Sequence, residues 1–263
     1  MQLFSSSLLP LSLLSAALSL TACKSTTSPE PTTPDSTDEP APAEAAAAAD
    51  FNFGCEVDHS ALQPWTAEGM ELPEETIAKF ALWTVLDTDQ VPEMVSQSCT
   101  NPPPSGQYSP VKAALQGGVT RGDMVVVLED VTIYRAFTAQ DTTTECLSDS
   151  PAGEIGAWWS VIEPQDPKEA YRDNVGICPA WNDLSMMVTC TLEAGSVVII
   201  GPTQSASCTG TSSCDPAPEG WDADLPTTSA PQLFINTYAN GERRSEEELG
   251  AFIECETPVA WAS

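Results

Sequence analysis

The chain has 263 residues, of which 38 are acidic and 9 are basic, so its formal net charge is −29 at pH 7. Six of the acids and one of the bases precede Phe51, and residues 51–263 therefore keep a net charge of −24. A domain this acidic repels the phosphates of nucleic acids and of anionic lipid headgroups. Its net charge therefore excludes nucleic acids and anionic lipids as partners that are attracted by the electrostatic field of the whole domain. The 213 residues from Phe51 onward are enough to bury one sizeable core.

A short apolar run, Leu8–Leu20, lies near the start of the chain. It is shorter than the ~20 apolar residues that a membrane-spanning helix needs, and Pro10 interrupts it. A short apolar segment followed by small residues is typical of a secretory signal peptide, although Met1–Ser7 contains no Lys or Arg. We therefore expect the chain to be exported.

The run ends in Leu20-Thr21-Ala22-Cys23, which resembles the lipobox of bacterial lipoproteins. The resemblance implies that residues 1–22 are a signal peptide, cut off before Cys23, and that the Cys23 thiol carries diacylglycerol and so makes the membrane a partner. Two or more acyl chains anchor a protein stably. Lys24, rather than Asp, follows the cysteine, and in the enterobacterial sorting rule this favours the outer over the inner membrane. The alternative is an ordinary signal peptide beside a chance cysteine.

Residues 23–50 are rich in Pro, Thr, Ala and acidic side chains and have almost no large apolar ones. Such a segment cannot bury enough surface to offset the loss of chain entropy. Its prolines favour extended conformations. We expect a disordered, lipid-anchored tether that is followed by an extracytoplasmic domain over residues 51–263.

The first part of this domain, residues 51–120, has helical patterns. Leu72–Glu75 has the proline and the acidic residues that suit a helix start, and apolar residues recur at helical spacing as far as Leu86. A second short helix is predicted over Pro110–Gln116, with Gly117-Gly118 at its end.

Residues 121–263 have β patterns instead, because β-branched and aromatic residues cluster in short runs. We predict strands over residues 124–128, 131–137, 157–162, 186–192, 197–200 and 232–236. Glu193–Ser196 would be the turn of a hairpin, and Ser245 would cap a short terminal helix. The predicted fold class is α+β, with two N-terminal helices and a mainly antiparallel β body.

Cysteine use indicates that this domain is stapled by disulfides. An even number of cysteines in an exported chain favours disulfides over free thiols. The sequence does not select a pairing, but Cys208 and Cys214 could close a short loop, and Cys55 and Cys99 flank the helical part. Zinc is excluded because there is no CxxC motif and His59 is the only histidine, so no metal site is expected. The eight cysteines are Cys55, Cys99, Cys146, Cys178, Cys190, Cys208, Cys214 and Cys255.

One ordered series of short motifs lies between residues 134 and 235. Arg135 ends a predicted strand, Trp158-Trp159-Ser160 lies in a later one, and Gln232 precedes another. Together with the glycine-centred pattern at 192–201, this order of motifs resembles the order found in mono-ADP-ribosyltransferase-like toxins. The resemblance implies NAD as cofactor. Arg135 would bind the NAD phosphates, Ser160 would lie in the nicotinamide ribose pocket, Trp158 or Trp159 would stack on nicotinamide, and Gln232 would hold the position of the catalytic glutamate.

Gln232 departs from that pattern, because a neutral amide cannot stabilise an oxocarbenium-like centre as a carboxylate does. Tryptophans such as Trp158 and Trp159 would also suit a surface that binds protein or glycan, and they could equally be buried aromatics of the sheet. We therefore expect a binding or structural module of a lipid-anchored envelope protein, without a cofactor, rather than an enzyme. The sequence does not identify its ligand or its protein or glycan partner. An NAD-binding domain, active or inactive, is the second hypothesis.

Overall fold

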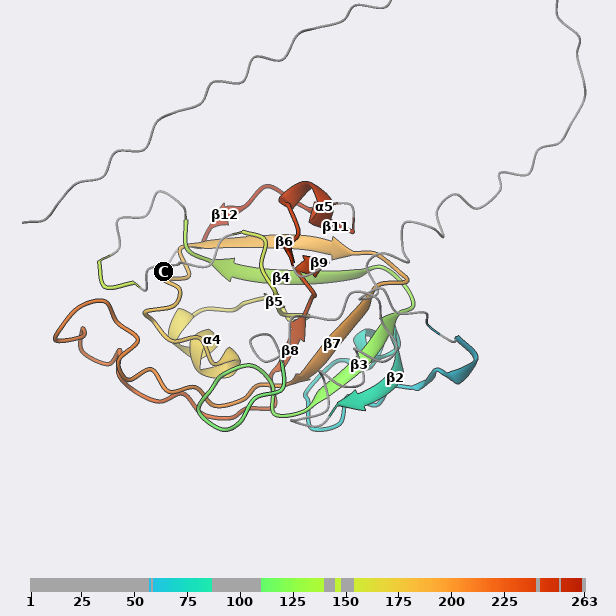
Figure 1. Ribbon diagram of the computed structural model, residues 1–263, viewed down its shortest axis with the longest axis horizontal. Helices are drawn as coiled ribbons and strands as arrows, with labels where there is room; N and C mark the ends of the chain where they lie inside the picture. The colour runs from blue at the N-terminus through green and yellow to red at the C-terminus, as the bar shows by residue number, and fades with distance from the viewer. Residues whose placement is uncertain are drawn as a thin grey trace, which may run out of the picture. The chain divides into compact units, whose positions relative to one another are not determined.

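The computed structural model describes Val57 and residues 59–86, 110–139, 145–147, 154–239, 242–250 and 252–261 (Figure 1). The predicted signal peptide, Cys23, the tether, Cys55 and Cys99 lie outside the described residues. Within the described part, no helix is long and apolar enough to cross a membrane.

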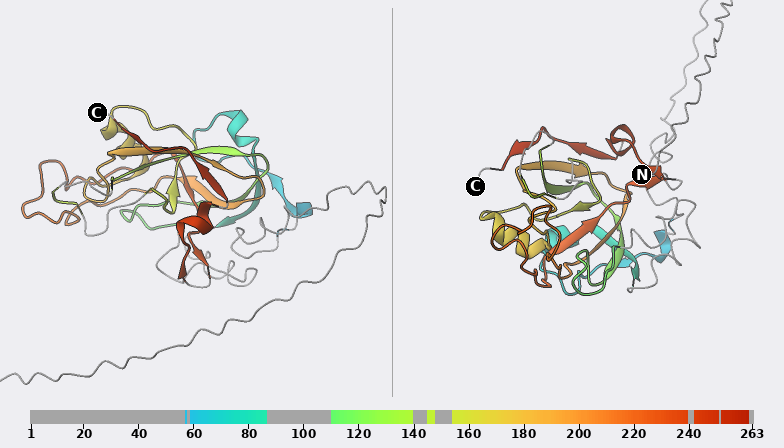
Figure 2. Two further views of the ribbon diagram at one scale, coloured as in Figure 1. Left: turned by 90° about the horizontal axis from the view of Figure 1, so that it is seen from above. Right: turned by 60° about the vertical axis from the view of Figure 1, so that its left-hand side comes forward.

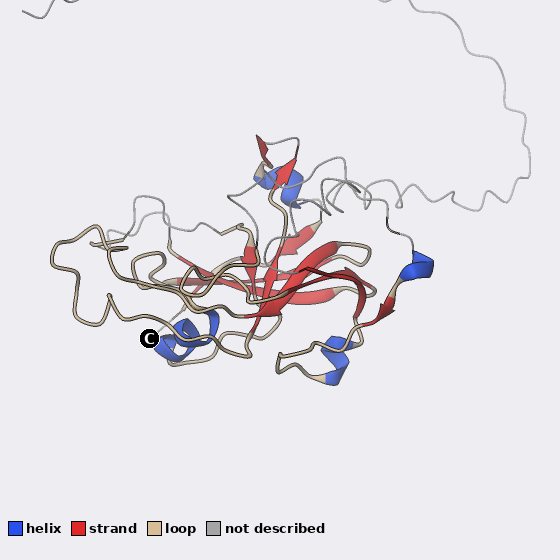
Figure 3. Cartoon of the chain, turned by 60° about the horizontal axis from the view of Figure 1, so that its bottom comes forward, coloured by secondary structure: helices blue, strands red, loops and turns tan. Residues whose placement is uncertain are grey.

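Two antiparallel sheets form the body of the domain, and Figure 3 shows their strands in red. The larger sheet has the order β1-β2-β3-β7-β8-β5. These strands are β1 (Gln63–Pro64), β2 (Phe80–Leu86), β3 (Gly122–Val127), β7 (Val197–Pro202), β8 (Pro231–Phe234) and β5 (Trp158–Trp159). In the smaller sheet, β6 (Met186–Leu192) pairs with β4 (Val131–Phe137), β11 (Ile253–Cys255) and β12 (Val259–Ala260). A separate ribbon joins β9 (Tyr238–Ala239) and β10 (Glu242–Arg243).

Helices are few and short in the described residues. They are η1 (His59–Ala61), α2 (Glu74–Ile77), α4 (Lys168–Val175) and α5 (Glu246–Gly250). The predicted α+β class with a mainly antiparallel β body is confirmed. The cap of α5 is also as predicted: the backbone N–H and the hydroxyl of Ser245 both donate to Glu248, at 2.7 and 3.0 Å, and the Glu248 N–H donates back to the Ser245 hydroxyl.

The main core lies between the two sheets. Val125 and Val127 of β3 face the same apolar cluster as Ile133 of β4 and Leu192 of β6. The alternate residues of β3 belong to a second cluster on the opposite face of the larger sheet, which Val111 and neighbouring residues cover. Every residue of β3 is therefore buried, and its run of valines suits a strand covered on both faces.

The sandwich is closed at one end by two chain crossovers, whose loops bond to each other. The chain passes between the sheets twice there, from β3 to β4 and from β6 to β7. The N–H of Val127 donates to the Ser196 carbonyl at 2.9 Å, and the N–H of Gly195 donates to the Val127 carbonyl at 2.7 Å. Figures 1 and 2 show the strands of the two sheets converging at this end, while α4 lies where they diverge.

Of the two predicted helices, the first is right only at its start and the second is wrong. Only Glu74–Ile77 is helical in the first, and Phe80–Leu86 is strand β2. Its register against β3 shifts between Leu82 and Thr84, and this bulge breaks the period of two, so that apolar residues fall at helix-like intervals. Pro110–Gln116 is irregular, since Val111 and Gln116 make isolated β-bridges with Val119 and Ala206.

The β predictions need two corrections. Met186–Leu192 and Val197–Pro202 are strands, but they do not form a hairpin, because β6 belongs to the smaller sheet and β7 pairs with β3 and β8. The strand predicted over 157–162 is only Trp158–Trp159, followed by an isolated bridge at Ser160. Helix α4 was not predicted.

Three disulfides staple the described residues. They join Cys146 to Cys214, Cys178 to Cys208, and Cys190 to Cys255. The predicted closure of a loop between Cys208 and Cys214 is therefore wrong. The actual partners are 68 and 30 residues away in the sequence, so no local spacing marks them.

Candidate functional site

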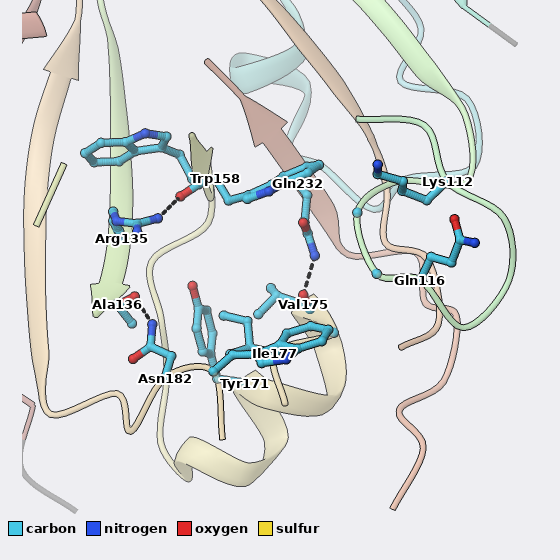
Figure 4. A pocket seen from close by; sticks show the side chains of 15 residues that line it. Lys112, Gln116, Arg135, Ala136, Trp158, Tyr171, Val175, Ile177, Asn182 and Gln232 are labelled. Carbon is cyan, nitrogen blue, oxygen red and sulfur yellow. Dashed lines mark hydrogen bonds between the residues drawn. The ribbon is translucent and has the colours of Figure 1, made fainter. Parts of the chain in front are cut away.

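A cavity of about 260 Å³ lies at the open end of the sandwich (Figure 4). Its walls come from the 112–118 loop, the end of β4, β5, α4, the loop that follows α4, and the start of β8. The lining residues are Lys112, Gln116, Gly117, Gly118, Arg135, Ala136, Trp158, Trp159, Tyr171, Val175, Gly176, Ile177, Trp181, Asn182 and Gln232.

Strand β5 connects the two sheets and brings the distant parts of this site together. It pairs with β8 in the larger sheet, so that Trp158 lies opposite Phe234. Ser160, the residue after β5, exchanges backbone hydrogen bonds of 2.8 and 2.9 Å with Tyr134 of β4. Arg135, the two tryptophans and Gln232 consequently meet at one place although about 100 residues of chain separate the first from the last.

Arg135 is held in the cavity wall, and the residue is 8 % exposed. Its Nη1 donates to the Trp158 carbonyl at 2.6 Å, and its Cζ lies 5.9 Å from the centre of the Trp159 ring. Gly156 makes room for the guanidinium, because a Cβ built there would collide with it. The Gly156 carbonyl also accepts a 2.6 Å hydrogen bond from Trp159 Nε1. The planar cation is thus fixed by backbone and ring contacts rather than free to swing.

Helix α4 places a tyrosine in the cavity. The helix begins after Pro167 and ends at Gly176, whose φ of +61° is the left-handed conformation that suits glycine. Tyr171 and Val175, four residues apart, are its buried face. In Figure 4 the Tyr171 hydroxyl points into the cavity. Burial raises the pKa of Tyr171 to about 12, against a smaller lowering by the charge of Arg135, so the hydroxyl stays a neutral donor at physiological pH.

The two amides of the lining have structural partners. Gln232 donates through Nε2 to the carbonyl of Val175, which ties β8 to the end of α4. Asn182 donates to the Ala136 carbonyl at 2.9 Å and accepts from the Leu184 N–H at 2.8 Å. These side chains therefore fix the cavity walls more than they offer free groups to a ligand.

Lys112 stands across the cavity from Arg135 (Figure 4). Its backbone is pinned, because its N–H donates to Val119 at 3.0 Å and its carbonyl accepts from Gln204 at 2.9 Å. Lys112 has no ion-pair partner among the described residues. Its ammonium is therefore available to a ligand in the cavity.

The charge of this cavity is opposite to that of the chain. Its lining contains two cations, Lys112 and Arg135, and no carboxylate from the described residues. The chain as a whole has 38 acidic side chains against 9 basic ones. The site is thus a local positive region in a strongly negative molecule, and it favours an anionic ligand.

The structure brings together most of the predicted site residues but not all of them. Arg135, Trp158, Trp159 and Gln232 line the cavity, whereas Ser160 does not. The Ser160 hydroxyl donates to the Ile162 carbonyl at 2.6 Å and lines a smaller second cavity of about 160 Å³, which shares Tyr171 and Val175 with the first. Sequence reasoning missed Lys112 and Tyr171. The proline and glycine that flank α4 were the available signal for Tyr171, and no local signal marks Lys112.

Among the described ranges, no group of three or more His, Cys, Asp or Glu side chains is arranged to hold a metal ion. Comparison of the chain with protein-family models, with curated proteins and with solved structures gives no match.

Proposed function

We propose that the protein is a lipid-anchored envelope protein whose β domain binds a small organic anion in the cavity between Lys112 and Arg135. The reversed charge of the cavity is the observation that carries the binding role. Two cations and no described carboxylate line it, in a chain of net charge −29. Two cations that line one space in a strongly acidic chain suit an anion that enters it.

The contacts inside the cavity favour binding over catalysis. The polar groups of Asn182 and Gln232 already bond to backbone carbonyls, and Tyr171 is neutral at physiological pH. None of the described lining residues is a carboxylate, a histidine or a thiol, so the lining supplies no obvious general base. Such a site can recognise and retain a solute.

A comparison of two carboxylates with their neutral amides tests this role. Benzoate and cyclohexanecarboxylate would be titrated into the full-length oxidised protein beside benzamide and cyclohexanecarboxamide, with tryptophan fluorescence as the readout because Trp158 and Trp181 line the cavity. We expect each carboxylate to bind at least tenfold more tightly than its amide. Equal affinity of acids and amides would refute an anion site.

Lys112→Gln and Lys79→Gln are a matched pair of variants for the same assay. Both remove one positive charge, but Lys79 lies outside the cavity and donates to the Asp130 carbonyl at 3.0 Å. Carboxylate binding is expected to weaken in the first variant and to stay unchanged in the second. Equal weakening of carboxylate binding in both variants would mean that affinity depends on the net charge of the protein and not on a cation in the cavity.

The anchoring part of the proposal rests on Leu20–Cys23. Cys23→Ala is expected to move the protein from the membrane fraction to the soluble fraction, whereas Ser25→Ala, two residues further on, leaves it on the membrane. Membrane retention of the Cys23→Ala protein would refute the lipid anchor.

An NAD-binding domain is the second candidate function. It is favoured by the convergence of Arg135, Trp158 and Gln232 on one cavity, in the order of the ADP-ribosyltransferase-like motifs. Three features weigh against it: Ser160 lies elsewhere, Gln232 is bonded to Val175, and about 260 Å³ is too small to enclose a whole dinucleotide. Saturable quenching by NAD that is lost in Arg135→Ala would support it.

A further inference from the structure

We infer that the anion of this cavity is an aromatic carboxylate of roughly ten non-hydrogen atoms, with its carboxylate at Lys112 and its ring against Trp158. This inference rests on the proposed anion-binding function and narrows it to one class of ligand. Three properties of the cavity carry it: its volume, its aromatic walls, and the closeness of a cation to one of those walls.

The volume sets the size of the ligand. A space of about 260 Å³ corresponds to about nine water molecules at the ~30 Å³ that each occupies in the liquid. A single six-membered ring with one substituent fits within such a space. A nucleotide or a disaccharide exceeds it, and a lone inorganic anion leaves most of the apolar wall in contact with water, which the hydrophobic effect disfavours.

The walls favour a flat ring. Trp158, Trp181 and Tyr171 all contribute aromatic surface to the cavity, and Val175 and Ile177 add aliphatic surface beside them. Trp158 is fixed by an edge-to-face contact with Phe234, at 5.1 Å between ring centres, and it is only partly buried in the free protein. Aromatic pairs gain energy beyond that of the area they bury, so an aromatic ligand has an advantage here over an aliphatic one of equal size.

The loop at Gly118 places the stem of the Lys112 side chain next to the ring surface, with its ammonium three bonds further on. A Cβ built on Gly118 would lie 3.0 Å from Cγ of Lys112 and 3.3 Å from Cη2 of Trp158, so both side chains border the same point. Gly117 contacts the Trp181 ring in the same way, at 3.6 Å from such a Cβ. Both glycines have positive φ, +69° and +77°, which brings the backbone close to the indoles.

Because the Lys112 side chain lies close to the Trp158 ring, the ligand's carboxylate should be attached directly to its aromatic ring. A carboxylate bonded directly to a ring can meet the Lys112 ammonium while the ring lies on Trp158. A carboxylate on a long flexible chain would pay additional entropy to reach the same position. The Tyr171 hydroxyl faces the same space and can donate to an acceptor elsewhere on the ring.

The four-ligand comparison described above also tests this inference, because ring type and charge vary independently in it. Benzoate and cyclohexanecarboxylate carry the same charge and have the same number of non-hydrogen atoms. We expect benzoate to bind about three- to tenfold more tightly to the full-length oxidised protein. We also expect this preference to shrink in Trp158→Leu while the preference of acid over amide remains.

Each result has a definite meaning. If cyclohexanecarboxylate binds as tightly as benzoate, the aromatic inference is overturned and the anion site still stands. If the amides bind as tightly as the acids, the anion site fails and this inference fails with it. If NAD saturates the protein and neither carboxylate binds, the inference is overturned in favour of the NAD-binding candidate. The ligand comparison uses the unaltered protein, so it decides the matter even if Trp158→Leu does not fold.

Discussion

Gly156→Ala is a small change with a large expected effect, because the guanidinium of Arg135 occupies the space of the missing side chain. The built Cβ collides with that guanidinium, and Gly156 has no positive φ that would strain an alanine by itself. Arg135 would have to leave the Trp158 carbonyl and the Trp159 ring. A hydrogen bond from a charged group contributes about 1.5–3 kcal/mol, and a cation–π contact adds about 0.5–1 kcal/mol. We therefore expect a loss of about 2–4 kcal/mol in the free energy of unfolding.

Urea denaturation with the disulfides intact measures this loss, and Gly250→Ala is its control. A Cβ at Gly250 meets nothing within 4 Å, and its φ is also ordinary, so that substitution is expected to be nearly neutral. Arg135→Ala should lower the free energy of unfolding by at least about 1 kcal/mol less in the Gly156→Ala background than in the wild type. The reason is that Gly156→Ala has already broken the contacts of Arg135. Wild-type stability of Gly156→Ala, or full additivity of the two changes, would refute the account of how Arg135 is held.

Three further predictions concern the same end of the domain and its core. Joint replacement of Cys178 and Cys208 by Ser is expected to lower the free energy of unfolding by about 3–4 kcal/mol, as loop-closure entropy for a separation of 30 residues gives, and chemical denaturation measures it. The pKa of Tyr171 is raised by burial to about 12, above the ~10 of the unfolded chain, so the stability due to this shift is complete below pH 10 and is lost between about pH 10 and 12. Tyr171→Phe should remove up to about 3 kcal/mol of that alkaline loss in denaturation curves recorded across this range. Trp65→Phe deletes the 2.8 Å hydrogen bond to buried Asp123 and is expected to cost about 1–3 kcal/mol in urea denaturation, whereas partly exposed Trp221→Phe should cost little.

The strands that the sequence predicts correctly are those with regular patterns. β3, β4 and β6 are rich in β-branched and apolar residues, and the β3–β7 and β4–β6 pairings have no register shift. β2 fails because its bulge moves the buried residues out of alternation, which local pattern reading takes for a helix. The helix predicted over residues 110–116 fails because Val111 bridges to Val119 within the same loop and Gln116 bridges to Ala206, 90 residues further along the chain.

The candidate site was predictable only where residues follow one another in a recognisable order. Arg135, Trp158, Trp159 and Gln232 fit such an order, and they share a cavity. Lys112 reaches the same cavity on an irregular loop whose position depends on contacts with Val119 and Gln204, and no sequence pattern indicates such contacts. Disulfide partners are hidden for the same reason, since their proximity is a product of the fold.

The two ends of the sandwich are stabilised differently, and this difference explains why a cavity exists at one of them. At the crossovers, the chain itself joins the sheets through residues 128–130 and 193–196, whatever side chains are present. At the opposite end, the backbone pairing of Ser160 with Tyr134 is supplemented by side chains: Arg135 reaches from β4 to the Trp158 carbonyl, and Gln232 reaches from β8 to α4. Substitutions at those side chains should therefore alter the shape of the cavity before they unfold the sheets. Ligand selectivity at this end can vary while the fold is preserved by the other, which is the arrangement expected when a rigid body carries a binding site at its rim.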